Sequence, residues 1–215
     1  MTDFSELESS LSESSTIFDE IIKRREELIK ESRDVISLCS KGIILVHTAD
    51  LKGAEELRKT ARTQLLALKR VAGADLTKYL ITPEQEYVEC AILIAVSLEK
   101  PIPSRKSLGV SLNSYVLGLL DLIGELKRKV YDSIRKKDFD TAEKMFSIMQ
   151  QIYTRVSPFA LYDHVVQGIR RKLDVARILI EDTRAIITEE SRRREFISAL
   201  NKVSDKLGLE GITDS

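Results

Sequence analysis

The segment Thr82–Leu98 reads TPEQEYVECAILIAVSL, and it is the best indicator of the fold class in this sequence. From Cys90 onward the segment is almost wholly apolar, which is typical of a helix that is buried on all sides. Thr82 and Pro83 form a helix start, with the threonine as N-cap and the proline in the first turn. We therefore predict a central buried helix that begins near Thr82 and ends near Leu98.

The rest of the chain also predicts long helices. The chain of 215 residues has only 9 Gly and 4 Pro, and no stretch alternates as a strand would. The sequence KPIPSR at 100–105 is the clearest break, with a short turn from Ser104 to Gly109. The other helices are expected at 17–46, Leu51–Ala72, Ser111–Lys136, Phe139–Val156, Leu161–Ile187 and Ser191–Lys206. These elements predict an all-α, seven-helix bundle in one domain, 1–215, with frayed tails at 1–15 and 207–215.

Composition narrows the class of protein. Lys and Arg together number 34, as do Asp and Glu, so the net charge is zero, which argues against a simple polycation. Cys39 and Cys90 are the only cysteines, and each lies in an apolar helical context that favours a buried thiol. No signal peptide pattern is present, and no apolar run reaches the ~18 residues that a membrane span needs. We expect a cytoplasmic protein with no membrane association.

Two pairs of carboxylates lie in unusually apolar surroundings. Glu86 and Glu89 are three residues apart, and Asp121 and Glu125 are four apart, so each pair shares one helix face. Carboxylates beside an apolar core are costly unless they are paired or bind a metal. Oxygen donors suit Mg²⁺ or Mn²⁺, and such a set is suitable for phosphodiester hydrolysis. The alternative, that these acids belong to a salt-bridged helix surface, stays open from spacing alone.

Several sequence blocks, in order, resemble the translin/Trax superfamily, and Trax more than translin. The blocks run from Glu31-Ser-Arg-Asp-Val to Val46-His47, then Gln85-Glu-Tyr-Val-Glu89, Tyr115-Val-Leu-Gly118, Asp121-Leu-Ile-Gly-Glu-Leu126 and Asp138-Phe-Asp-Thr141. The resemblance implies a seven-helix bundle of the translin type, and a homo-oligomer in the form of a hollow octamer that encloses RNA.

The resemblance to Trax also implies an activity, a Mg²⁺-dependent endoribonuclease that acts on single-stranded RNA. The acidic motifs of Trax match Glu86, Glu89, Asp121 and Glu125, which become candidate catalytic and metal-binding residues. Basic residues in the matched blocks are candidates for contact with RNA: Arg33, Lys41 and Arg128. The sequence departs from the family at 76–81, where a stretch often rich in Arg and His has only Lys78 as a basic residue.

Two other functions are compatible with the sequence. The first is a non-catalytic scaffold, similar to translin, that binds single-stranded RNA or DNA. The second is a helical assembly protein in which the acids are incidental. Cleavage of RNA in the presence of a metal separates the nuclease from both.

Overall fold

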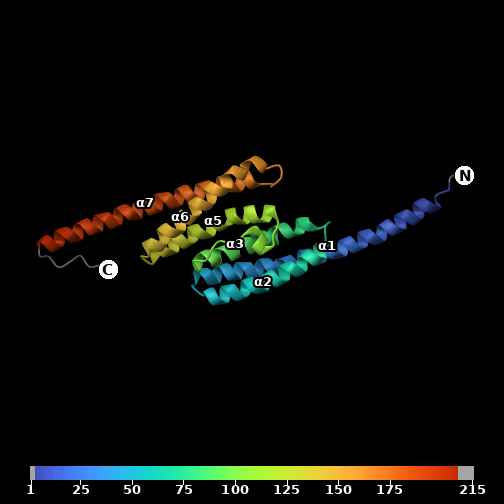
Figure 1. The fold of residues 1–215 in the computed structure, drawn as a ribbon, viewed down its shortest axis with the longest axis horizontal. Helices are drawn as coiled ribbons and strands as arrows, with labels where there is room; N and C mark the ends of the chain where they lie inside the picture. The colour runs from blue at the N-terminus through green and yellow to red at the C-terminus, as the bar shows by residue number, and fades with distance from the viewer. Residues whose placement is uncertain (1–2, 208–215) are drawn as a thin grey trace. The chain divides into compact units, whose positions relative to one another are not determined.

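The computed structural model describes residues 3–207, and these residues form seven α-helices, two 3₁₀ helices and no strand (Figure 1). The all-α, seven-helix prediction is therefore confirmed. The elements are α1 (Ser5–His47), α2 (Leu51–Ala72), η1 (Thr77–Leu80), α3 (Ile81–Ser97), α4 (Arg105–Leu108), α5 (Leu112–Arg135), α6 (Phe139–Val156), η2 (Ser157–Tyr162) and α7 (Ile169–Leu207). Among residues 3–207, no helix combines the length and the hydrophobicity that a membrane span requires.

The chain groups into two compact units rather than one uniform body. The first unit holds the residues up to Leu122 together with Tyr162–Ile169, and the second holds Ile123–Leu161 together with the residues from Arg170 on. Helix α5 belongs to both units, because the boundary falls between Leu122 and Ile123 inside one continuous helix.

In the first unit, α1 and α2 form an antiparallel hairpin. The turn between them is closed by Asp50, whose side chain accepts a hydrogen bond from Gly53 N at 2.9 Å and caps α2. At the other end of the hairpin, Arg24 of α1 forms an ion pair of 2.5 Å with Asp75, just beyond the end of α2. The predicted break between the helices at 17–46 and Leu51–Ala72 and the predicted end at Ala72 are therefore confirmed, with α1 ending one residue later, at His47.

Helix α3 is the central helix of the first unit and packs against both α1 and α2. Every residue from Cys90 to Val96 is buried, as the apolar run predicts. The predicted N-cap at Thr82 is wrong, because α3 begins at Ile81 directly after η1 and no side chain caps it. Pro83 is still tolerated, since the first N–H groups of a helix have no partner within that helix.

The second unit is formed by the later part of α5, by α6 and by α7. Its core contains Leu126, Val130, Met145, Met149 and Ile180, all of which are buried. The prediction of separate helices at Leu161–Ile187 and Ser191–Lys206 is wrong, because α7 continues without interruption to Leu207. Most of the predicted tail at 1–15 is helical, since α1 begins at Ser5. The predicted tail at 207–215 lies outside the described residues, except for Leu207, which is the last residue of α7.

Candidate active site on helices α3 and α5

A close contact at Gly118 fixes how α5 packs against α3. A Cβ atom at Gly118 would lie 2.8 Å from the carbonyl oxygen of Gln85 and 2.8 Å from Cβ of Val88, so only glycine allows this approach. One turn earlier, Ser114 Oγ donates a hydrogen bond to the carbonyl oxygen of Ile81 at 3.2 Å. Ile81 pairs with Ser114, and Gln85, one turn later on α3, pairs with Gly118, one turn later on α5. The two helices therefore run parallel in a fixed register.

This register brings three of the four predicted acids to neighbouring turns of the two helices. Asp121 lies one turn after Gly118 on α5, while Glu86 and Glu89 flank Val88 on α3, and all three side chains are half-buried. Glu125 lies one turn further along α5, in the second unit, where its carboxylate is 4.0 Å from the guanidinium of Arg128. The structure therefore places Glu125, a predicted catalytic residue, in an ion pair with Arg128, a predicted RNA-binding residue.

Two buried thiols mark the position of Glu86 and Glu89 relative to α1. Cys39 of α1 and Cys90 of α3 are both fully buried, and Gly42 leaves the room that the Cys90 sulfur occupies. The hydrogen bond between the thiols, then burial, then the nearby charges of Glu86 and Glu89 raise the pKa of Cys39 well above its usual value. Both glutamates thus lie close to the contact between α1 and α3, and the thiol beside them stays protonated.

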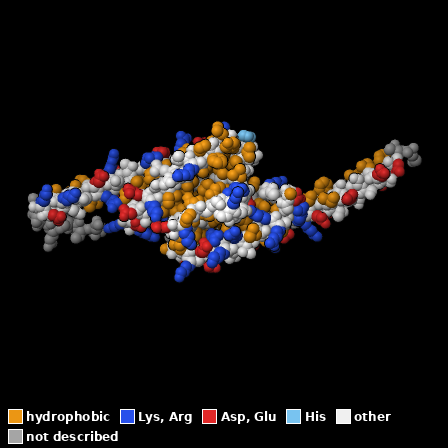
Figure 2. Space-filling model, viewed as in Figure 1, with side chains coloured by type: hydrophobic (Ala, Val, Ile, Leu, Met, Phe, Trp, Pro, Cys, Tyr) orange, Lys and Arg blue, Asp and Glu red, His pale blue; other side chains and the backbone are white. Residues whose placement is uncertain are grey.

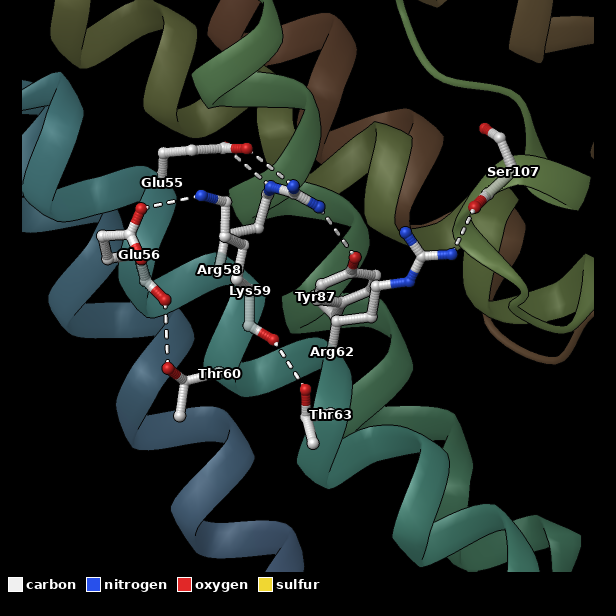
Figure 3. Close-up of polar contacts among 9 residues, drawn as sticks. All are labelled: Glu55, Glu56, Arg58, Lys59, Thr60, Arg62, Thr63, Tyr87 and Ser107. Carbon is white, nitrogen blue, oxygen red and sulfur yellow. Dashed lines mark hydrogen bonds and ion pairs between the residues drawn. The ribbon is translucent and has the colours of Figure 1, made fainter.

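An arginine of α2 joins this helix to α3 at Tyr87, the residue that follows Glu86 in the sequence (Figure 3). Arg58 donates to the hydroxyl of Tyr87 at 3.1 Å and to the two carboxylate oxygens of Glu55 at 2.8 Å and 2.7 Å. Burial raises the pKa of Tyr87, while the hydrogen bond to Glu55 is the main cause that raises the pKa of Arg58. The phenol therefore stays neutral and the guanidinium stays charged, which holds this turn of α3 in place.

A second buried network fixes the first turn of α3. Glu84 is 3% exposed, forms an ion pair of 2.6 Å with Lys69 of α2, and accepts a hydrogen bond from Ser111 N at 2.9 Å. Lys69 also donates to the carbonyl oxygen of Gly109. Burial raises the pKa of Glu84, but the hydrogen bonds from Lys69 and Ser111 outweigh it and lower the pKa below its usual 4.5. Glu84 is therefore an anchor that ties α2, α3 and the start of α5 together.

The chemistry of the four acids suits a hard cation, since every donor is a carboxylate oxygen. Within the part of the chain that the structure describes, however, no three side chains of Asp, Glu, His or Cys are grouped so that they could hold a metal ion. The register of α3 and α5 brings Glu86, Glu89 and Asp121 to neighbouring turns of the first unit, and it does not by itself assemble a coordination sphere.

The predicted RNA contacts lie on the surface. Arg33 and Lys41 are exposed on α1, and Arg128 is exposed on α5. The structure also contains a cluster around Tyr79 of η1 that the sequence did not predict. Arg25 Nε donates to the Tyr79 hydroxyl at 2.8 Å, and the charges of Arg25 and Lys78 lie 5.6 Å and 5.2 Å from the centre of its ring.

This cluster supplies positive charge next to the segment 76–81, where the sequence has only Lys78. The hydrogen bond from Arg25 is the main cause that lowers the pKa of Tyr79. Arg25 and Tyr79 are 54 residues apart in sequence, so no local spacing could have joined them. The only sequence signal was a tyrosine beside a lysine in a short segment between two helices.

Comparison with known proteins identifies the family. The model of the Translin family matches residues 23–182, and the chain therefore belongs to the translin family. An uncharacterized protein of Methanocaldococcus jannaschii is 31% identical over 191 residues, which is 86% of this chain and 85% of that protein.

Solved structures with the same fold include two of AfC3PO and one of NeC3PO. The crystal structure of AfC3PO has a TM-score of 0.79 with 32% identity, and the structure of AfC3PO in complex with duplex RNA has a TM-score of 0.77 with 30% identity. Both comparisons cover 86% of this chain and 98% of AfC3PO. Apo-NeC3PO, at 23% identity and a TM-score of 0.73, shares the fold over 83% of this chain and 95% of its own.

Proposed function

We propose that this protein binds RNA and cleaves single-stranded RNA as a metal-dependent endoribonuclease of the Trax type. RNA binding is supported by the solved complex of AfC3PO with duplex RNA, because this chain covers 98% of that protein. The main support for nuclease activity is the fixed register of α3 and α5, which brings Glu86, Glu89 and Asp121 to neighbouring turns.

The residues have separate parts in the proposed reaction. Glu86, Glu89 and Asp121 would hold Mg²⁺ or Mn²⁺, and Glu125 would act as a further ligand or as a base. A bound ion of this kind polarises a phosphoryl oxygen and lowers the pKa of water. Arg58 and Glu84 do not touch the substrate in this proposal; they hold α3 so that the acids keep their places.

A non-catalytic RNA-binding scaffold is the second candidate function. It is favoured by the absence, among the described residues, of any group of three potential ligands arranged to hold a metal. In that case the protein binds RNA tightly and does not cut it, whether or not a divalent ion is present.

Cleavage of a labelled, unstructured RNA separates these two functions. We expect the wild type to cut this RNA with Mg²⁺ and not with EDTA, and we expect Asp121→Asn and Glu89→Ala to lose cleavage while they still bind. Asp132→Asn is the matched control, because it removes the same charge from the same helix outside the acidic set. A duplex of the same sequence tests the preference for single strands. Binding without cleavage by the wild type would establish the scaffold.

Metal binding also has a readout that is independent of activity. Carboxylates held near one another repel and raise one another's pKa, and a bound cation relieves this repulsion. We therefore expect Mg²⁺ to raise the melting temperature of the wild type, and to raise it less in Glu89→Ala. A melting temperature that stays constant across the Mg²⁺ titration would count against the metal site.

We propose that Arg33, Lys41 and Arg128, together with Arg25, Lys78 and Tyr79, contact the RNA. Each cation that neutralises a phosphate of a single strand contributes about 0.7 to the slope of log K against log salt. Lys41→Ala is therefore expected to reduce this slope by about 0.7, whereas Tyr79→Leu should weaken binding without changing the slope, because a stacked ring carries no charge.

We also propose that the protein assembles with itself, as a hollow octamer that encloses RNA, and that it acts in the cytoplasm. Self-assembly is tested by the molar mass of the purified protein in sedimentation equilibrium, and a mass equal to that of one chain would contradict it.

A further inference from the structure

Helix α1 has a mainly apolar stripe along one face, and only the second half of the stripe is buried. Residues at alternating steps of three and four are buried in this half: Leu28, Ser32, Val35, Cys39, Gly42 and Val46. The same steps continued toward the N-terminus pass through the polar residues Arg25 and Ser14 and through the half-buried Ile21. They also reach Phe18, Leu11, Leu7 and Phe4, which are 52% to 63% exposed. Figure 2 shows hydrophobic side chains along this part of α1. We call residues 4–22 the N-terminal stripe.

The hairpin partner of α1 does not reach the N-terminal stripe. Helix α2 ends at Ala72, and the residues just beyond it meet α1 at Arg24, which bonds to Asp75 and to the carbonyl oxygen of Val71. Large apolar side chains at coiled-coil spacing that remain exposed mark a surface for another protein segment.

Charge restricts which segment can cover the N-terminal stripe. All the charged residues before Lys23 are acidic: Asp3, Glu6, Glu8, Glu13, Asp19 and Glu20. Two copies of this stripe packed together would bring carboxylates near one another at the flanking positions, with no cation in residues 4–22 to offset them, which disfavours self-pairing. The complementary segment is an apolar stripe flanked by cations.

The last part of α7 has these properties. Phe196, Leu200 and Val203 follow steps of four and three along one face and are 64%, 38% and 54% exposed. The residues around them are mostly basic, with Arg192, Arg193, Arg194, Lys202 and Lys206 against Glu195 and Asp205. This segment, residues 192–206, matches the N-terminal stripe in spacing and is opposite to it in charge.

We propose that the N-terminal stripe of one copy packs against residues 192–206 of α7 in a second copy. The inference rests on the self-assembly part of the proposed function and specifies which surfaces assemble. The two surfaces differ, so each copy contributes one of each, and such a contact closes into a ring when the rotation between copies allows it. Charge complementarity at the flanking positions sets the choice of partner.

Single substitutions on either surface test the proposal. We expect Leu11→Asp and Leu200→Asp each to lower the molar mass in sedimentation equilibrium at least two-fold. Their neighbours Ser12→Asp and Asn201→Asp are matched controls, because both positions are exposed and the added charge is the same. An oligomer that survives both leucine variants would overturn this inference and leave self-assembly intact, whereas a monomeric wild type would overturn both.

Cross-linking distinguishes the proposed pairing from other contacts. Leu11→Cys and Leu200→Cys are purified separately, mixed and oxidised, with Cys39 and Cys90 kept because they are fully buried. We expect a covalent dimer in the mixture and none from either variant alone. A dimer from Leu11→Cys alone would show that the N-terminal stripes pair with each other, and no dimer in the mixture would also overturn the proposal.

Discussion

At the scale of single residues, glycine positions in α5 have opposite consequences. The Cβ of an alanine at Gly118 would lie 2.8 Å from a backbone oxygen of α3, and a backbone atom cannot move aside as a flexible side chain can. At Gly124, on the same helix, a Cβ would meet nothing within 4 Å. The first glycine is required by packing, and the second weakens the helix without any contact that requires it.

We expect Gly118→Ala to destabilise the protein by about 1–3 kcal/mol through overpacking. Gly124→Ala should stabilise it by up to about 1 kcal/mol, because alanine is the better helix former. Urea denaturation followed by circular dichroism measures both changes. Equal effects of the two substitutions would show that Gly118 does not set the spacing of α3 and α5.

The buried carboxylate of Glu84 gives stability a defined dependence on pH. Its pKa is lowered in the folded state, so its contribution is complete above its usual value of 4.5 and is lost as the pH falls through the lower, folded pKa. Glu84→Gln should cost about 3 kcal/mol at neutral pH, because Lys69 loses its partner, and this cost should shrink below pH 4.5. Glu56→Gln, at an exposed pair, should leave stability unchanged at either pH. A cost that is constant with pH would show that the ion pair with Lys69 does not stabilise the fold.

At the scale of elements, helix ends were predictable where a cap or a turn residue sets them. Asp50 caps α2, Ser111 Oγ accepts from Ser114 N at 3.2 Å near the start of α5, and Gly109 ends α4 in the left-handed conformation. Each of these signals is local. The split predicted within α7 failed, because a gap in the apolar pattern at 188–191 contains only residues that a helix tolerates. The start of α7 also differs from the predicted Leu161: the helix begins at Ile169, directly after Gly168, where φ is 82°.

Removal of one cap tests this local control. Asp50→Ala should destabilise the protein by about 1 kcal/mol, since Gly53 N loses its acceptor. Asp50→Asn should retain most of that stability, because asparagine caps a helix equally well. Thermal unfolding of the two variants measures the difference. An alanine variant as stable as the asparagine variant would mean that tertiary packing alone positions α2.

The candidate site was predictable only in part, for a related reason. Helical spacing selected Glu86, Glu89, Asp121 and Glu125, because three or four residues make one turn. The groups that hold those turns in place come from distant parts of the chain. Ser111 meets Glu84 across 27 residues, and Arg58 meets Tyr87 across 29. The spacing of residues within one helix cannot predict these contacts between distant segments.

At the scale of the whole molecule, α5 passes through both compact units without a break. The sequence predicts one domain, and a shared helix gives a physical reason for the units to unfold together, because melting its first half frays the second. We expect amides of α3 and of α6 to show the same denaturant dependence in native-state hydrogen exchange. Different midpoints for the two helices would show that the units fold separately.

The pair of thiols between α1 and α3 has a practical consequence for the study of this protein. Cys39 and Cys90 are fully buried, and the Cys39 thiol is held in its protonated, unreactive form. An alkylating reagent can therefore modify these two thiols only when α1 separates from α3. The rate of labelling at increasing reagent concentration reports how often this contact opens. The two native thiols can therefore be used to measure local opening of the structure beside Glu86 and Glu89.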